Sequence, residues 1–346
     1  MTTTKSYKTP PALATGKLIF EPFLSILSEN LLTQTMNVVK PPRLRRGDLI
    51  GIVAPGSPAA PEKLTKGVRY LEQLGYRVVV GKNIERRRGY LAGTDKQRAE
   101  DLNAMFADRR VKAIFTVRGG YGVHRILHLV DYTTVRRNPK IVVGYSDVTA
   151  LHLALFAKTR LVTFLGPMVA TEFGRGFGGP AEDLFWRIIT SPKPPGFIKN
   201  PGGRKLTVLR RGATTGRLLG GNLSLVAALL GTPFFPDVHR YILALEEVEE
   251  PPYKIDRMFH HLRLSGMLSR KNGFIIGDIA TTPPTRGKAS LTLRQILADV
   301  FSSAESPCMA GFHFGHVRGS LTLPLGVIAR LTTGRKTLEI RESAVQ

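Results

Sequence analysis

The chain has 346 residues, of which 42% are hydrophobic and 22% charged, a composition that excludes a disordered tail and a fibrous repeat. Its formal net charge is +24, and residues 1–43 contribute only +3 of it, so the remainder of the chain is strongly basic and would attract anions of many kinds. The single cysteine, Cys308, excludes an internal disulfide framework and a Cys-rich zinc site, and the lack of a run of about 18 apolar residues predicts no membrane span.

The chain divides into four segments. We expect residues 1–43 to be a leader that is disordered or not native, because the sequence from Met36 looks like a natural domain start. The leader is not expected to be a signal peptide, because a charged residue and a proline interrupt its one apolar stretch and no cleavage pattern follows. The remaining length suits about two domains. We expect an N-terminal domain over 44–171, a linker and substrate loop over 172–205, and a C-terminal domain over 206–340.

The N-terminal domain alternates apolar runs with helical patterns. One helix is expected at 61–74, and the capping-box pattern from Thr94 to Gln97 predicts another through Phe106. The expected strands are 48–54, 76–80, 111–117 and 140–143. This alternation predicts an α/β fold, in which helices cover a parallel sheet in a Rossmann or flavodoxin-like arrangement and ligands bind at the carboxyl ends of the strands.

The first candidate for chemistry is Ser146, in the sequence Gly144-Tyr145-Ser146-Asp147. A strand precedes this sequence and a helical pattern follows it, which places Ser146 on a sharp turn with its hydroxyl at the carboxyl edge of the sheet, as in a nucleophile elbow. The second glycine of the G-x-S-x-G motif is missing, because Val148 stands there. From the residues alone, Ser146 is either a helix N-cap or a nucleophile.

The C-terminal domain is expected to be the smaller of the two, and α/β or β-rich. Its expected elements are strands at 241–247, 273–279 and 309–314 and a helix at 255–264. Glu246 lies at the buried end of the first strand, where an acid needs a partner. His316 follows the last strand, where a loop can carry a catalytic base. A serine nucleophile needs such a base and acid, so Ser146, His316 and Glu246 form a candidate triad that the residues alone leave open.

Seven segments, taken together and in order, carry a more specific signal. They are 47–57, 89–98, 117–122, 144–147, 220–223, 245–257 and 311–316. The ordered set resembles the LD-carboxypeptidase family of serine peptidases, which includes murein tetrapeptide carboxypeptidases and microcin-immunity hydrolases. The resemblance covers about residues 45 to 335. Each segment by itself is a weak signal, and their order makes the match specific.

The resemblance implies a role for each residue that matches a family motif. Ser146 would be the nucleophile, His316 the general base, and Glu246 the acid that orients the base. Glu247 stands where an aspartate is common in the family, which is a conservative departure. The implied chemistry needs no metal and no other cofactor.

Further residues are implied around this triad. The oxyanion hole would consist of the backbone N–H groups of Asp147 and of Gly119 or Gly120, since glycine lets the backbone approach a substrate closely. Arg118, Tyr121 and Asn222 are weaker candidates for substrate contacts, and Arg118 would bind an anionic group. Turn packing and surface charge explain these three residues equally well.

The implied reaction is the removal of the terminal D-alanine from murein tetrapeptide during peptidoglycan recycling. An alternative on the same fold is an immunity-type amidase that cleaves peptidyl-nucleotide antibiotics, and an aromatic residue in the 172–205 segment able to stack on a base would favour it. Trp186 lies there, but its amphipathic surroundings favour core packing. Residues 174–179 match G-x-G-x-x-G without a preceding strand, so we do not expect a dinucleotide site.

A third interpretation, a nucleic-acid-binding or scaffolding protein, rests on the basic charge alone. The sequence has no zinc-ligand pairs and no run of aromatics among basic residues typical of RNA-binding domains, so we expect no nucleic acid partner, and no membrane partner. The expected partner is the small peptide substrate. The resemblance also implies a homodimer and a cytoplasmic location, and the single cysteine fits that compartment.

Overall fold

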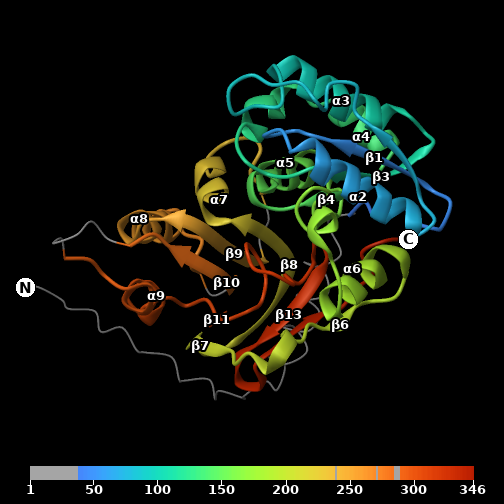
Figure 1. Ribbon diagram of the computed structural model, residues 1–346. Helices are drawn as coiled ribbons and strands as arrows, with labels where there is room; N and C mark the ends of the chain where they lie inside the picture. Colours follow the sequence, from blue (N-terminus) through green and yellow to red (C-terminus); the bar gives the residue numbers. More distant parts are fainter. Residues whose placement is uncertain (1–37, 238–239, 270–271, 284–288) are drawn as a thin grey trace, which may run out of the picture. The chain divides into compact units, whose positions relative to one another are not determined.

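The structure is a computed structural model that describes residues 38–237, 240–269, 272–283 and 289–346 (Figure 1). Most of the predicted leader therefore lies outside the described residues. Its last six residues, 38–43, make backbone hydrogen bonds with later parts of the chain. The N–H of Val39 donates to the carbonyl of Arg160 at 2.9 Å, and the N–H of Arg43 donates to the carbonyl of Gln346 at 2.8 Å.

Five strands from the first half of the chain and one from near its end form a six-stranded sheet in the order β12-β5-β4-β3-β1-β2. The strands are β1 (Leu49–Val53), β2 (Arg77–Val80), β3 (Val111–Thr116), β4 (Ile141–Gly144), β5 (Thr163–Leu165) and β12 (Leu323–Leu325). The first five are parallel, as their apolar sequences predict, because strands covered on both faces need apolar side chains on both. β12 comes from the far end of the chain and pairs antiparallel with β5.

Helices cover this sheet (Figure 1). They are α2 (Pro61–Gln73), α3 (Asp95–Ala107), α4 (Tyr132–Arg137), α5 (Thr149–Thr159) and α6 (Pro180–Thr190). The capping box predicted at Thr94 is present, since its hydroxyl accepts from the N–H of Gln97 and the Gln97 side chain accepts from the N–H of Thr94. α3 packs against β1 and β3, and α5 packs against β5.

The second half forms an eight-stranded mixed sheet in the order β6-β14-β13-β8-β9-β10-β11-β7. Its strands are β6 (Gly196–Phe197), β7 (Thr207–Arg210), β8 (Ala213–Asn222), β9 (Tyr241–Glu250), β10 (Gly273–Thr281), β11 (Cys308–Ala310), β13 (Ile328–Thr332) and β14 (Thr337–Ile340). Its helices are α7 (Leu223–Leu229), α8 (Pro252–Leu264) and α9 (Leu293–Ser302). The four central strands, β8 to β11, are parallel, and the outer strands are antiparallel.

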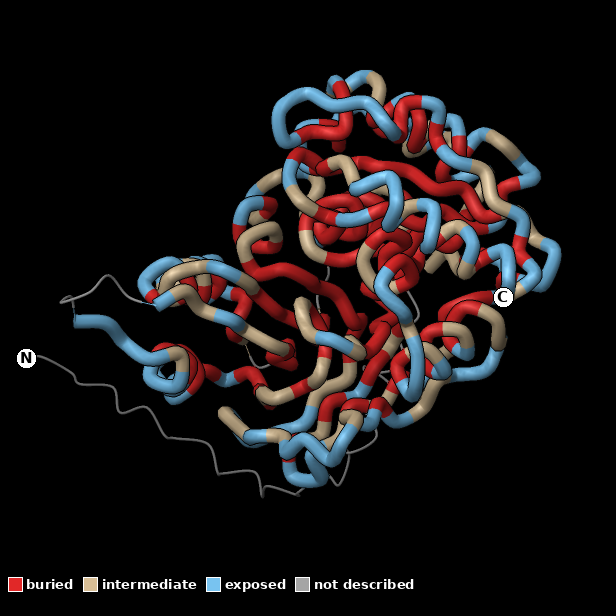
Figure 2. The backbone as a smooth tube through the Cα atoms, in the orientation of Figure 1, coloured by how far each residue is buried: buried red, intermediate tan, exposed pale blue. Residues whose placement is uncertain are grey.

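The predicted α/β class is confirmed, and the cores lie around the strands of both sheets, which are largely buried in Figure 2. The strands predicted at 241–247 and 273–279 are longer than expected and end at Glu250 and Thr281, whereas a third predicted strand is too long. The strand expected at 309–314 ends at Ala310, because Gly311 has a φ of 94° and the chain turns into a loop there. The 172–205 segment contains α6 and β6 as well as loops. Among the helices described, none is both long and apolar enough to cross a membrane.

Candidate active site

The structure brings five of the predicted site residues to one pocket. Arg118, Gly119, Gly120, Ser146 and His316 all line a pocket of about 230 Å³. The first four lie just beyond the carboxyl ends of β3 and β4, which are parallel neighbours. His316 arrives from the loop after β11 in the other sheet. The pocket therefore lies at the strand edge where ligands of parallel sheets are expected.

Ser146 occupies a strained backbone position between β4 and α5. Its φ is 62°, a left-handed conformation that is uncommon for residues other than glycine and is found where a tight turn holds it. The residue begins a 3₁₀ turn, Ser146–Val148, and α5 starts directly afterwards at Thr149. Its hydroxyl caps neither segment, so the N-cap interpretation is wrong. The side chain is instead presented to the pocket.

The His316 imidazole is held by a buried acid. Its Nδ1 lies 2.6 Å from Oε2 of Glu246, which is fully buried in β9, whereas the His316 side chain keeps 21% of its surface exposed. With Nδ1 as the donor, Nε2 is left free to accept a proton. Burial alone would lower the pKa of His316, but the hydrogen bond and the negative charge of Glu246 raise it above its ordinary 6.5.

A glycine allows the loop to bring His316 so close to Glu246. Gly315 has a φ of 108°, and a Cβ built on it would lie 2.7 Å from both Cβ and Oε2 of Glu246. Any larger residue would separate the imidazole from the carboxylate. The backbone of the same loop is fixed by the N–H of Asp278 on β10, which donates to the carbonyl of Phe314 at 3.0 Å.

Tyr145 connects the turn of Ser146 to the loop of His316. Its ring packs edge-to-face against His316, with 5.1 Å between the ring centroids. Its hydroxyl donates to Oε1 of Glu172 at 3.0 Å, and the other oxygen of Glu172 accepts from the N–H of Met168 at 2.8 Å. Burial raises the pKa of Glu172. Because Tyr145 is itself buried, its ring therefore restrains the imidazole of His316 by packing against it.

The turn after β3 lies against Ser146. A Cβ built on Gly119 would be 2.7 Å from Cβ and 3.0 Å from Oγ of Ser146, so only glycine fits here. Among the described residues, nothing accepts a hydrogen bond from the N–H groups of Gly119 and Gly120. These two donors therefore remain available to a negatively charged oxygen at the pocket wall.

The carboxylate of Asp147 helps to hold the same turn. Its Oδ2 accepts from the N–H of Val123 at 2.9 Å, and burial raises the pKa of Asp147 to about 6. Ser57 supports the turn from the other side, because its N–H donates to the carbonyl of Gly119 at 3.0 Å and its hydroxyl accepts from the N–H of Tyr121 at 3.1 Å. The turn beside Ser146 is thus held by hydrogen bonds to Asp147 and Ser57, neither of which is among the described residues that line the pocket.

Two predicted substrate contacts lie elsewhere. The Asn222 side chain is buried and donates to Oε1 of Glu247 at 2.6 Å, while its oxygen accepts from the N–H of Leu225 at the start of α7. Tyr121 is 69% exposed and packs edge-to-face against Tyr90. Neither is among the described residues that line the pocket. Their roles as substrate contacts stay predictions.

Sequence reasoning did not identify several residues of this region. Arg98 has a fully buried side chain that donates to the carbonyls of Pro55 and Gly122 and pairs with Asp95. Its position four residues before Leu102, on the apolar side of the predicted helix, was the available signal. Lys63 and Arg175 line the pocket, but nothing local in the sequence distinguishes them from other surface cations.

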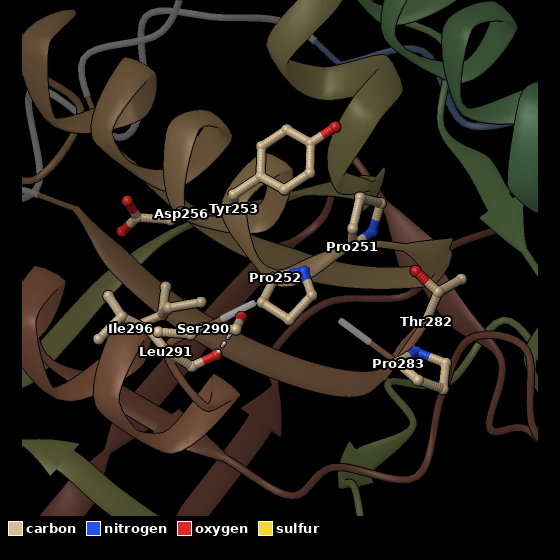
Figure 3. A pocket seen from close by; sticks show the side chains of 10 residues that line it. Pro251, Pro252, Tyr253, Asp256, Thr282, Pro283, Ser290, Leu291 and Ile296 are labelled. Carbon is tan, nitrogen blue, oxygen red and sulfur yellow. Dashed lines mark hydrogen bonds between the residues drawn. The ribbon is translucent and has the colours of Figure 1, made fainter. Parts of the chain in front are cut away.

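A larger cavity, of about 640 Å³, lies away from these residues (Figure 3). It is lined mainly by apolar groups near the start of α8, among them Pro251, Pro252 and Leu291, with Asp256 as its acidic residue. None of the predicted site residues borders it. In the part of the chain that the structure describes, no three His, Cys, Asp or Glu side chains gather into a metal site.

Two family models match separate regions of this chain. Residues 50–166 match the model of the LD-carboxypeptidase N-terminal domain, and residues 215–331 match the model of the LD-carboxypeptidase C-terminal domain. A probable murein peptide carboxypeptidase of Bacillus subtilis is 40% identical over 301 residues, covering 87% of this chain and 94% of the relative.

Two solved proteins have similar structures. A muramoyltetrapeptide carboxypeptidase from Oxalobacter formigenes matches with a TM-score of 0.74 and 28% identity over 85% of this chain and 99% of its own. The microcin C7 self-immunity protein MccF in its wild-type apo state matches with a TM-score of 0.78 and 26% identity, over 89% of this chain and 100% of its own. The curated MccF of Escherichia coli is 28% identical, over 86% of this chain and 94% of the relative.

Proposed function

We propose that this chain, a serine-type carboxypeptidase that belongs to the LD-carboxypeptidase family, removes the terminal D-alanine of murein tetrapeptide with a Ser-His-Glu triad. One observation carries the proposal. Ser146, held at a φ of 62°, shares a pocket with His316, and the Nδ1 of that histidine donates to the buried Glu246. This is the order of nucleophile, base and orienting acid that serine-dependent amide hydrolysis requires.

In the acylation step, Nε2 of His316 takes the hydroxyl proton as Oγ of Ser146 attacks the amide carbonyl carbon. The carbonyl electron pair moves onto its oxygen, which becomes negatively charged. When this intermediate collapses, the C–N bond breaks and His316 returns the proton to the leaving amine of D-alanine. A water molecule, deprotonated by the same imidazole, then releases the shortened peptide and restores the Ser146 hydroxyl.

Glu246 and the turn glycines stabilise the charges that these steps create. The carboxylate fixes the imidazole with Nδ1–H toward itself and favours the imidazolium formed during attack. The N–H groups of Asp147 and of Gly119 or Gly120 would receive the oxyanion. Preorganised donors of this kind are worth on the order of 10²–10³ in turnover each.

Two observations support a murein peptide as the substrate. A relative at 40% identity bears the name probable murein peptide carboxypeptidase, and one at 30% identity the name murein tetrapeptide carboxypeptidase. Among the described residues, the pocket is also lined by one lysine and two arginines and by no aspartate or glutamate, which suits a peptide that ends in a carboxylate. Such a reaction would serve peptidoglycan recycling in the cytoplasm, and we further propose that the protein acts there as a homodimer.

The amidase alternative has a weaker basis in this chain. MccF has been solved in complex with aspartyl sulfamoyl adenosine, a ligand with an aromatic base. The aromatic residue that would favour such a ligand here, Trp186, stacks on Tyr76 with 5.3 Å between ring centroids, and its indole N–H donates to the Tyr70 hydroxyl at 3.1 Å. It does not border the pocket of Ser146. Packing thus engages this side chain.

Mass spectrometry with two substrates tests the proposal. The purified protein is incubated in parallel with murein tetrapeptide and with aspartyl sulfamoyl adenosine. We expect the tetrapeptide to lose one alanine residue, and the sulfamoyl conjugate to stay intact or to react far more slowly. Cleavage of the conjugate alone would reject the carboxypeptidase assignment in favour of the amidase.

A further inference from the structure

The pocket of Ser146 contains more positive charge than the catalytic steps need. Lys63 of α2, Arg118 after β3 and Arg175 after β5 all border it. All three are exposed, and none makes an ion pair or a side-chain hydrogen bond with any residue in the described ranges. None of the described residues that line the pocket carries a carboxylate. Three cations thus face one small space without a counterion from the described residues that line it.

Close backbone packing brings two of these cations together. α2 packs against the segment that ends in the 3₁₀ turn Phe173–Arg175. A Cβ built on Gly174 would lie 2.4 Å from the carbonyl oxygen of Lys63, so the two backbones are in direct contact. The side chains of Lys63 and Arg175 therefore start from neighbouring points beside the pocket. Arg118 lies next to Gly119, which abuts Ser146.

Glu172 does not neutralise this group of cations. Glu172 precedes Arg175 by three residues, but its two oxygens accept from the Tyr145 hydroxyl and from the N–H of Met168. Its charge acts on Arg175 only through space, without an ion pair. Like charges gathered at a partly enclosed surface repel one another and add nothing to stability, whereas they attract and orient an anion.

We propose that Lys63, Arg118 and Arg175 bind the free C-terminal carboxylate of the substrate and thereby restrict the enzyme to the last peptide bond. This inference rests on the proposed carboxypeptidase reaction. In a peptide, the terminal carboxylate carbon is separated from the scissile carbonyl carbon by one nitrogen and one Cα, a distance of at most about 4 Å. The carboxylate must therefore lie beside the nucleophile, where Arg118 begins the turn that touches Ser146.

The three side chains suit a carboxylate in different ways. An arginine can hold both carboxylate oxygens with two parallel hydrogen bonds, while a lysine acts as a point charge. A substrate with further residues after the scissile bond would place an uncharged amide among the three cations. It would then lose their attraction and leave them desolvated without a partner. This penalty is what makes the pocket selective for a free chain end.

Binding measurements test the assignment without depending on turnover. The Ser146→Ala protein is titrated calorimetrically with murein tetrapeptide and with the same peptide whose terminal carboxylate is converted to an amide. We expect the free acid to bind on the order of 10–100-fold more tightly, as for hydrogen bonds to a charged group. Adding Lys63→Met or Arg175→Met should reduce this ratio about tenfold and leave the affinity for the amide within about twofold.

Lys66→Met is the matched control, because Lys66 is exposed on the same helix but does not border the pocket. Equal binding of acid and amide, or no binding of either peptide, overturns the inference. Either result leaves the proposed function intact if the wild type still releases alanine. Conversely, the protein could prefer the acid through Lys63 and Arg175 and yet show no hydrolytic activity. That result would support the anion site and reject the proposed reaction.

Discussion

The imidazole Nδ1 of His316 lies 2.6 Å from Oε2 of Glu246, although 70 residues separate them in the chain. Glu246 is fully buried on β9, and His316 reaches it from a loop beyond β11. An acid in such a place is retained at a cost in desolvation, which its partner offsets. This pair is therefore the feature of the site that most directly fixes its pH behaviour.

Replacing the acid should shift the pH dependence of catalysis. His316 must be neutral to take a proton, so kcat/KM rises with pH through its pKa, which Glu246 raises above 6.5. Glu246→Gln removes the charge, so the acidic limb of the profile should move to lower pH. The rate at the plateau should also fall, on the order of 10³–10⁴-fold. A pH profile of kcat/KM checks both effects, and an unmoved acidic limb would contradict the assignment.

Asp147 should make stability depend on pH in a defined window. Burial raises its pKa from 3.8 to about 6, so the folded protein favours the protonated form and loses stability as pH rises between these values. Asp147→Asn cannot ionise and still accepts from the N–H of Val123. The free energy of unfolding of the wild type should therefore fall by up to about 3 kcal/mol relative to the variant between pH 4 and pH 7. Urea denaturation at both pH values measures this change, and a constant difference would refute it.

The turn beside the nucleophile should tolerate no side chain. In Gly119→Ala the new Cβ would lie 2.7 Å from Cβ of Ser146, so one of the two must move. We expect kcat to fall by at least about 100-fold, as misplacement of reacting groups by about 1 Å does. Gly334→Ala is the control, because a Cβ there meets no atom within 4 Å. Steady-state kinetics compare the two variants, and equal activity would mean that the turn is not packed on Ser146.

Arg98 should contribute to stability far more than its place in a helix suggests. Its buried guanidinium binds the carbonyls of Pro55 and Gly122 together with Asp95. Arg98→Met leaves these acceptors unpaired and should lower the free energy of unfolding by about 3 kcal/mol. Lys96→Met, on the exposed side of the same helix, should change it by less than about 1 kcal/mol. Chemical denaturation measures the free energy of unfolding of both variants, and equal losses would mean that Arg98 contributes no more than an ordinary surface cation.

Much of the fold could be predicted from local sequence. The strands at 111–117 and 140–143 were recognisable because strands covered on both faces are continuously apolar, and the helix after Thr94 because its capping box is a local pattern. β12 could not be predicted, because its place beside β5 depends on pairing across more than 150 residues. The strand predicted before His316 is too long, because apolar residues can also be buried in a loop, as Phe312 and Phe314 are.

Local sequence likewise predicts only some of the residues of the candidate site. Ser146 was a candidate from its motif alone, but choosing His316 and Glu246 as its partners required resemblance to a family, because spatial neighbours leave no local signal. The sequence did not identify the basic residues Lys63 and Arg175 as part of the site. The two residues border the same pocket because α2 packs on the segment after β5, which no sequence pattern reveals.

Replacing Ser146 tests most directly whether this residue is the nucleophile. Wild type and Ser146→Ala are incubated with murein tetrapeptide, and released alanine is followed by mass spectrometry, with circular dichroism to verify that both proteins fold alike. We expect the wild type to release one alanine per peptide and the variant to release it at least about 1,000-fold more slowly. A folded variant that retains activity within about tenfold of the wild type would contradict Ser146 as the nucleophile.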